Sequence, residues 1–160
     1  MNRIKKAMTE FKFDLQLFAG VLTYDPKRVQ VIFGARQLSG FADDSIISIA
    51  PHGEGMQLYV GADGEVGRSI DPDHTFEVTI SLATTSKSNT YLSGIYNLDR
   101  ATGKGMMPLL IKDLSGDTLF FAEQAWVSNF PEAGRGRTID TQEWVIQTGQ
   151  VESPIIGGNN

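Results

Sequence analysis

The chain of 160 residues contains no cysteine and only two histidines. Without cysteine it can form no disulfide framework, no thiolate metal site and no cysteine nucleophile, which fits assembly in a reducing cytoplasm. With so few histidines, a Ser-His-Asp triad would depend on one of that pair, and no G-x-S-x-G motif is present to supply an activated serine. The missing residue types therefore argue against an enzyme.

Long apolar runs and clustered basic residues are missing as well. Uninterrupted hydrophobic runs stay far below the roughly 20 residues that cross a bilayer, so we predict a soluble protein without a membrane anchor. Residues 1–20 begin with basic side chains, but Glu10, Lys12 and Asp14 leave no apolar stretch for a signal peptide. The net charge of −5 argues against a dedicated nucleic-acid binder, which needs clustered lysine and arginine to hold phosphates.

What the chain does contain is alternation with a period of two residues. In residues 74–83 every second side chain is apolar, and the positions between are polar: Thr75, Glu77, Thr79 and Ser81. This pattern predicts a half-buried antiparallel strand with one polar face. Residues 141–151 alternate in the same way. Residues 118–128 are apolar on both faces around Phe120, Phe121 and Trp126, which predicts a central strand.

Glycine-containing turns predict three hairpins. Gly34-Ala35-Arg36 is a three-residue connection between strands 28–33 and 37–41, and the other turns lie at residues 62–65 and 114–117. The one internal helix is expected at residues 88–100, with Ser88 or Asn89 as its N-cap and a stop before Gly103. We therefore predict a mainly β domain, an antiparallel sandwich or partial barrel with one flanking α-helix.

Three segments are expected to extend from the β domain of residues 21–152. They are an N-terminal arm (residues 1–20), a β-arm within the domain (residues 50–72) and a C-terminal tail (residues 153–160). The β-arm would carry Met56, Leu58 and Val60 away from the body, either to bind a partner or as an ordinary surface hairpin. The N-terminal arm alternates apolar and polar residues, as a strand does, through Phe11, Phe13, Leu15 and Leu17. It would be added to a neighbouring subunit, or to its own domain.

Possible reactive clusters do not match the chemistry that they would need. Asp71, Asp73 and His74 fit no EF-hand or zincin pattern and predict a turn at the start of a strand. The Gly-Lys-Gly of residues 103–105 lacks the P-loop spacing and follows a helix. Asp43-Asp44 has the composition of a turn between strands. We predict no catalytic residue, no cofactor and no metal site.

Five stretches, taken in their order and spacing, resemble the bacteriophage tail tube proteins. They are VQVIFGARQLSGFADDSIISI (29–49), VGADGEVGRS (60–69), HTFEVTISLA (74–83), PLLIKDLSGDTLFFAEQAWV (108–127) and TQEWVIQTGQV (141–151). The resemblance is greatest to the tubes of contractile-tailed phages, and contractile bacteriocins and type VI secretion tubes share this subunit architecture. The resemblance implies that the subunits form hexameric rings, that the rings stack into a tube, and that the genome passes through its lumen. Residues 1–20 lie outside the matching motifs.

The resemblance suggests roles for the residues singled out above. Thr75, Glu77, Thr79 and Ser81 are the candidates for the lumen face. Contacts between subunits are expected from three groups: Phe11, Phe13, Leu15 and Leu17; Met56, Leu58 and Val60; and Arg135 and Arg137, which suit a salt bridge to an acidic neighbour.

The implied partners are further copies of the chain, a tail sheath, a baseplate hub or initiator, a tape measure and a terminator. The location would be the virion tail, assembled in the host bacterial cytoplasm.

Acidity would suit a DNA conduit, because a wall of like charge repels phosphates over about one Debye length, roughly 8–10 Å. Many soluble proteins are mildly acidic for other reasons, however. A tail terminator or baseplate ring protein would use a similar fold but stop at one ring, and a bacteriocin tube would lack a genome. A ligand-binding sandwich would need an apolar pocket with convergent polar groups, which no motif indicates.

Overall fold

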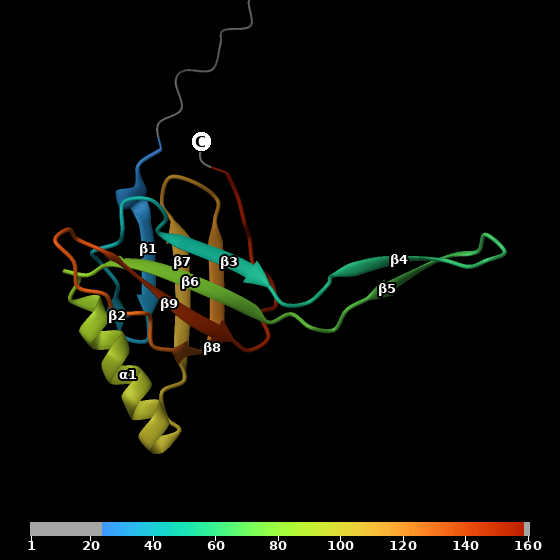
Figure 1. The fold of residues 1–160 in the computed structure, drawn as a ribbon. Helices are drawn as coiled ribbons and strands as arrows, with labels where there is room; N and C mark the ends of the chain where they lie inside the picture. Colours follow the sequence, from blue (N-terminus) through green and yellow to red (C-terminus); the bar gives the residue numbers. More distant parts are fainter. Residues whose placement is uncertain (1–23, 159–160) are drawn as a thin grey trace, which may run out of the picture.

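The structure, a computed structural model, describes residues 24–158 as a mainly antiparallel β fold with one α-helix (Figure 1). Its elements are η1 (Pro26–Arg28), β1 (Val29–Phe33), β2 (Arg36–Gln37), β3 (Ile47–Pro51), β4 (Met56–Val60), β5 (Val66–Ile70), β6 (Phe76–Ala83), α1 (Ser88–Thr102), β7 (Met107–Asp113), β8 (Leu119–Asn129) and β9 (Thr141–Thr148). Seven strands form one sheet in the order β2-β1-β7-β8-β9-β6-β3, and β4 and β5 form a second sheet. The predicted fold class is confirmed, and the sheet does not close into a barrel.

The large sheet folds over on itself, so that β3, β6 and β9 cross in front of β1, β7 and β8 (Figure 1). Strand β8 belongs to both layers, because it pairs with β7 from Leu119 to Ala125 and with β9 from Ala125 to Asn129. The register shifts between these two regions, where Leu109 faces Ala122 and Met107 faces Ala125. A bulge of this kind bends a strand and lets it pass from one layer to the other.

The bulge also explains the apolar character of both faces of β8. Phe120 and Ala122 point into the core before the bulge, and Ala125 and Val127 do so after it. The alternation therefore changes phase, and Phe121, on the outer face, is half exposed. The prediction of a central strand is confirmed.

The core lies between the two layers and takes side chains from β1, β6, β7, β8, β9 and α1. Phe76 of β6 meets Phe120 of β8 edge to face, with ring centroids 5.3 Å apart. Trp144 of β9 is the largest fully buried side chain. Its indole N–H donates to Asn89 Oδ1 at 2.8 Å, and this bond fixes the start of α1 against the sheet.

Helix α1 confirms the predicted helix but not its predicted cap. Leu92 and Ile95 are its buried apolar side chains, and Gly103 ends it with a φ of +67°. At the start of the helix, the backbone N–H of Ser88 donates to Ser86 Oγ at 3.1 Å. Ser88 itself is buried, and its hydroxyl donates instead to the backbone carbonyl of Ser39 at 3.0 Å. It therefore ties the helix to the loop after β2.

The three predicted hairpins are present, with one change in loop length. Phe33 pairs with Arg36, so the first turn contains two residues, Gly34 and Ala35, instead of three. Strand β2 is shorter than expected, because Gly40 with a φ of +75° turns the chain away from β1. At the other terminus, the backbone of Ile155 pairs with that of Leu119, so the predicted C-terminal tail adds to the start of β8.

Candidate assembly surfaces

The β4–β5 hairpin projects from the body as an arm, as the sequence predicted for Met56, Leu58 and Val60 (Figure 1). Residues that face each other across its ladder share a face, and three such pairs lie on one side: Met56 with Ile70, Leu58 with Arg68, and Val60 with Val66. The five apolar side chains among them are 56% to 74% exposed. We call this set the apolar arm face. The other side carries Gln57, Tyr59, Gly67 and Ser69.

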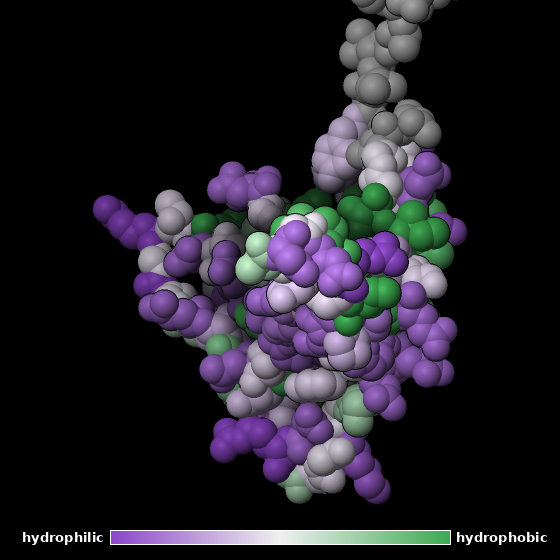
Figure 2. Space-filling view, turned by 90° about the vertical axis from the view of Figure 1, so that its right-hand side faces the viewer, coloured by the Kyte–Doolittle hydropathy of each residue, from purple (hydrophilic) through white to green (hydrophobic). Residues whose placement is uncertain are grey.

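In Figure 2 the arm points toward the viewer. On this side of the molecule, hydrophobic side chains are exposed next to hydrophilic ones. A monomeric protein rarely exposes several large apolar side chains together on one small element. The apolar arm face is therefore a candidate contact surface.

The base of the arm is held by two aspartates. Asp71 accepts the N–H of Glu54 at 2.7 Å and that of Asp73 at 3.0 Å. Asp73 accepts both the hydroxyl and the N–H of Thr75, at 2.7 Å and 2.9 Å. These bonds lower the pKa of Asp71, chiefly through the N–H of Asp73, and that of Asp73, chiefly through the hydroxyl of Thr75. The predicted turn is confirmed, and its carboxylates accept hydrogen bonds from backbone N–H groups.

The outer face of β3, β6 and β9 is polar. Thr79 lies between Ser48 and Val145, and Glu77 lies between Ala50 and Gln147. Gln147 donates to Glu77 Oε2 at 2.9 Å. None of these three strands contains lysine or arginine, while β6 and β9 each contain one glutamate. We call this the polar sheet face.

Three of the four lumen candidates, Thr75, Glu77 and Thr79, are half-buried and keep part of their surface open. Ser81 differs, because it is 5% exposed. Its N–H donates to Ile46 O at 3.1 Å, and its carbonyl accepts from Ala42 at 3.0 Å. The loop before β3 thus pairs with this end of β6. Because Ser81 is buried, the prediction that its side chain lies on an open surface is wrong.

The outer face of the second layer has an apolar row next to a row that contains Gln30 and Lys112. Ile32, Leu110 and Phe121 stand in one row across β1, β7 and β8, each directly opposite the next. Leu119, two residues before Phe121, is also exposed. The two outer faces of the folded sheet therefore differ in chemistry, which predicts different surroundings for each in an assembly.

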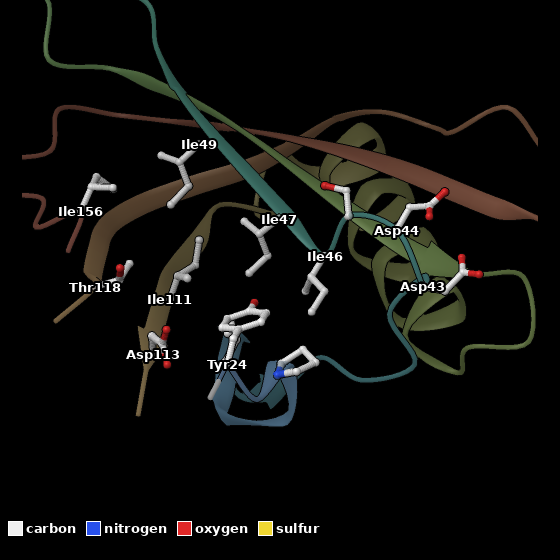
Figure 3. Close-up of a pocket in the computed structure, with 13 residues that line it drawn as sticks. Tyr24, Asp43, Asp44, Ile46, Ile47, Ile49, Ile111, Asp113, Thr118 and Ile156 are labelled. Carbon is white, nitrogen blue, oxygen red and sulfur yellow. The ribbon is translucent and has the colours of Figure 1, made fainter. Parts of the chain in front are cut away.

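A cleft of about 550 Å³ opens between the two free edges of the sheet. Strand β3 is one edge, and β2 pairs only with Ile32 and Phe33 of β1, so the start of β1 is the other. Figure 3 shows Ile47, Ile49, Ile111 and Ile156 around a common space, with Asp43 and Asp44 together at one side of it. Both aspartates are exposed, in the loop that the sequence predicted as a turn.

The remaining inter-subunit candidates fall in two places. Arg135 and Arg137 are exposed on the irregular loop between β8 and β9, where Arg135 donates to the carbonyl of Gly134 at 3.2 Å. Phe11, Phe13, Leu15 and Leu17 lie outside the described residues.

Within residues 24–158, no set of three or more histidine or carboxylate side chains is arranged to bind a metal ion. The same part of the chain has no helix with the length and apolar content to cross a membrane. His52 lies within 2.6 Å of Gln147 Oε1, measured from its Nε2, and thus links the base of the arm to β9. The described residues instead form three surfaces suited to contact with other molecules: the apolar arm face, the polar sheet face and the cleft.

Comparisons with known proteins agree with this description. Residues 32–157 match the family described as the bacteriophage PhiTE tail tube protein. Structural protein ORF10 of Pseudomonas phage KPP10 is 34% identical over 78% of this chain and 76% of its own length. The tube-terminating cap of the anti-feeding prophage, solved by cryo-electron microscopy, has a similar fold. The TM-score is 0.53 at 14% identity, covering 87% of this chain and 97% of the cap.

Proposed function

Since the chain belongs to the bacteriophage PhiTE tail tube protein family, and so is a structural protein of a phage tail and not an enzyme, we propose that it builds the tube itself. In this proposal, hexameric rings of the subunit stack head to tail. The stack leaves a channel for delivery of the genome. Contraction of a surrounding sheath would drive that delivery, as the sequence resemblance to contractile tails suggests.

The apolar arm face is the single observation that supports stacking most strongly. Met56, Leu58 and Val60 lie on a hairpin that projects from the body and has no apolar surface of its own to cover them. Burying such side chains against a neighbour is worth about 25 cal/mol per Å² of apolar surface. A contact between an arm and a different surface of the next subunit is heterologous, and it repeats without limit when the subunits do not close a ring.

The polar sheet face supports the choice of a lumen wall. Glu77 and Thr79 of β6, and Thr75 just before it, would face the channel. The strands β6 and β9 carry glutamate and no basic residue. DNA would pass without specific binding, because such a wall offers no cation to pair with phosphates and releases no counterions. The outer face of β1, β7 and β8, which carries Lys112 and the apolar row of Ile32, Leu110 and Phe121, would then lie away from DNA.

Other contacts follow from the same assembly. Phe11, Phe13, Leu15 and Leu17 would reach a neighbouring subunit, and Arg135 and Arg137 would pair with carboxylates of an adjacent copy. The sheath, the baseplate hub or initiator, the tape measure and the terminator are the further partners that a tube requires. Assembly would take place in the host cytoplasm, and the finished protein would be part of the virion tail.

A ring that ends a tube is the second candidate, because a tube-terminating cap has a similar fold. The cap belongs to the anti-feeding prophage. A tube in a headless, bacteriocin-like particle is therefore a variant of the first proposal. A terminator differs from a tube subunit in one measurable property. It forms one closed ring and does not polymerise.

Electron microscopy of the purified protein at rising concentration, with solution mass measured in parallel, tests the proposal. Open-ended tubes of stacked rings are the expected result. Isolated rings at every concentration would favour the terminator. A persistent monomer would leave either a tube subunit that needs its initiator or a ligand-binding module. The symmetry of the ring, read from end-on views, tests the hexamer separately.

A further inference from the structure

We propose that the cleft between the free edges of β1 and β3 receives the apolar arm face of a second copy of this chain. This inference rests on the proposed function, since it identifies the surface of the neighbouring subunit that the arm contacts. The cleft and the arm are then the two halves of one heterologous contact.

The first argument is the match in chemistry. Ile47, Ile49, Ile111 and Ile156 line the cleft (Figure 3). On the arm, five apolar side chains lie on one face of a two-stranded ribbon. The lining also includes polar residues, such as Asp113 and Thr118, and its isoleucines are the part against which an apolar face of a hairpin can be buried.

The second argument is the unpaired backbone on both sides of the cleft. Strand β3 pairs with β6 alone, and β2 leaves the start of β1 without a strand on its outer side. A free strand edge presents N–H and C=O groups that an added strand can satisfy. A hairpin that enters the cleft can therefore add backbone hydrogen bonds to the burial of its side chains.

The third argument is charge. Arg68 is the one basic residue on the apolar arm face, opposite Leu58, and it is exposed. Asp43 and Asp44 lie together at one side of the cleft and are exposed too. A third carboxylate of the cleft, that of Asp113, is buried and already accepts from Ser115, so the exposed pair is the one that an incoming Arg68 can meet. This pairing gives the contact an orientation.

The arm cannot occupy the cleft of its own subunit. It leaves the body after β3 ends at Pro51, while the cleft is bordered by the beginning of that strand, and it points away from the body (Figure 1). The occupant is thus a different copy. Since each copy presents one arm and one cleft, the contact continues from subunit to subunit.

Cross-linking tests the contact directly, because the chain has no cysteine that could form a competing disulfide. Two cysteines are introduced, Leu58→Cys on the arm and Ile49→Cys in the cleft, and the protein is oxidised after assembly. We expect a ladder of covalent multimers on a non-reducing gel. The matched control is Gln57→Cys with Ile49→Cys, which places the thiol on the opposite face of the arm and should give little ladder.

Other outcomes would overturn the inference. Tubes that give no ladder would remove the arm from the cleft and leave the proposed function intact, whereas a protein that forms no tubes would count against that function. Cross-linking that stops at dimers would indicate a symmetric contact. A disulfide between Phe13→Cys and Ile49→Cys, in place of the arm disulfide, would assign the cleft to the N-terminal segment.

A charge exchange tests the orientation. Arg68→Glu should raise the protein concentration needed for tube formation by about tenfold or more, because like charges would then meet at the cleft. Adding Asp43→Arg and Asp44→Arg should restore assembly. Lys104→Glu, an exposed change of the same sign after α1, is the control and should have little effect. Failure of the exchanged charges to restore assembly would contradict the proposed pairing.

Discussion

Gly34 and Gly94 show how differently two glycines of one chain are constrained. Gly34 has a φ of +61°, and an added Cβ would come within 2.5 Å of Met107 Sδ and 3.1 Å of the Tyr91 hydroxyl. That hydroxyl also donates to the carbonyl of Phe33 at 3.0 Å, so the turn is packed against α1 and β7. Gly94 lies on the exposed side of α1, where an added Cβ meets no atom within 4 Å.

Alanine at these two positions should therefore have opposite effects. Gly34→Ala should lower the free energy of unfolding by about 1–3 kcal/mol, because it forces a side chain into a left-handed conformation and a close contact. Gly94→Ala should raise it by about 0.8–1.0 kcal/mol, the difference in helix propensity between the two residues. Urea denaturation of both variants measures the two values, and a shift of the same sign in both would contradict this account.

At the scale of elements, the base of the arm depends on carboxylates that must be ionised. The pKa values of Asp71 and Asp73 are lowered in the folded protein from the ordinary value of 3.8. A lowered folded pKa means that their stabilising contribution is complete above the unfolded value and is lost as the pH falls through the folded value. The arm base should thus be stable at neutral pH and loosen in acid, below about pH 4.

Amide protection measured by NMR at decreasing pH tests this. We expect the N–H groups of Glu54, Asp73 and Thr75 to lose protection before that of Val78, which lies inside β6 and bonds to no carboxylate. Asp71→Asn should remove the part of the pH dependence that Asp71 carries. Equal loss at Thr75 and Val78 would show that the base of the arm opens only with the whole fold.

Local elements could be predicted from the sequence, because their signals are local. The Asp63-Gly64 turn, the alternation of β6 and the stop of α1 at Gly103 each depend on a few neighbouring residues. The bulge in β8 could not be predicted, since it is set by pairing with Met107 and Leu109 across the sheet. The burial of Ser81 could not be predicted either, because it depends on a loop far away in the sequence. Nor could the cleft, because it lies between β1 and β3, which are distant in the sheet order.

At the scale of the whole molecule, the described residues form a core of their own. Every buried apolar side chain of the described residues lies between Val31 and Val151. Deleting residues 1–20 should accordingly leave a folded subunit but block tube growth, if Phe11 and its neighbours bind an adjacent copy.

Circular dichroism measures the fold of this truncated protein, and electron microscopy measures its assembly. Deleting only residues 1–9 is the control, since it keeps Phe11 through Leu17 and should leave assembly unchanged. Normal tubes from the longer deletion would show that the N-terminal arm plays no part in the assembly.

At this scale, we predict that the polar sheet face lines the lumen of the assembled tube. Thr79 lies near the middle of that face, with its side chain directed outward, so Thr79→Lys should leave the fold unchanged. In a tube, the new charge would repeat in every subunit of every ring and would attract phosphates along the whole channel. We expect tails of normal appearance and a fall in infectivity of about tenfold or more, because DNA would be held instead of released.

Thr90→Lys supplies the matched comparison, since it adds the same charge at an exposed position of α1. Plaque titre per particle, compared between the two variants, separates an effect on the lumen from an effect of net charge. If Thr79→Lys infects normally, β6 does not face the channel. The outer face of β1, β7 and β8, where Lys112 lies next to the apolar row of Ile32, Leu110 and Phe121, would then be the next surface to test as the lumen wall.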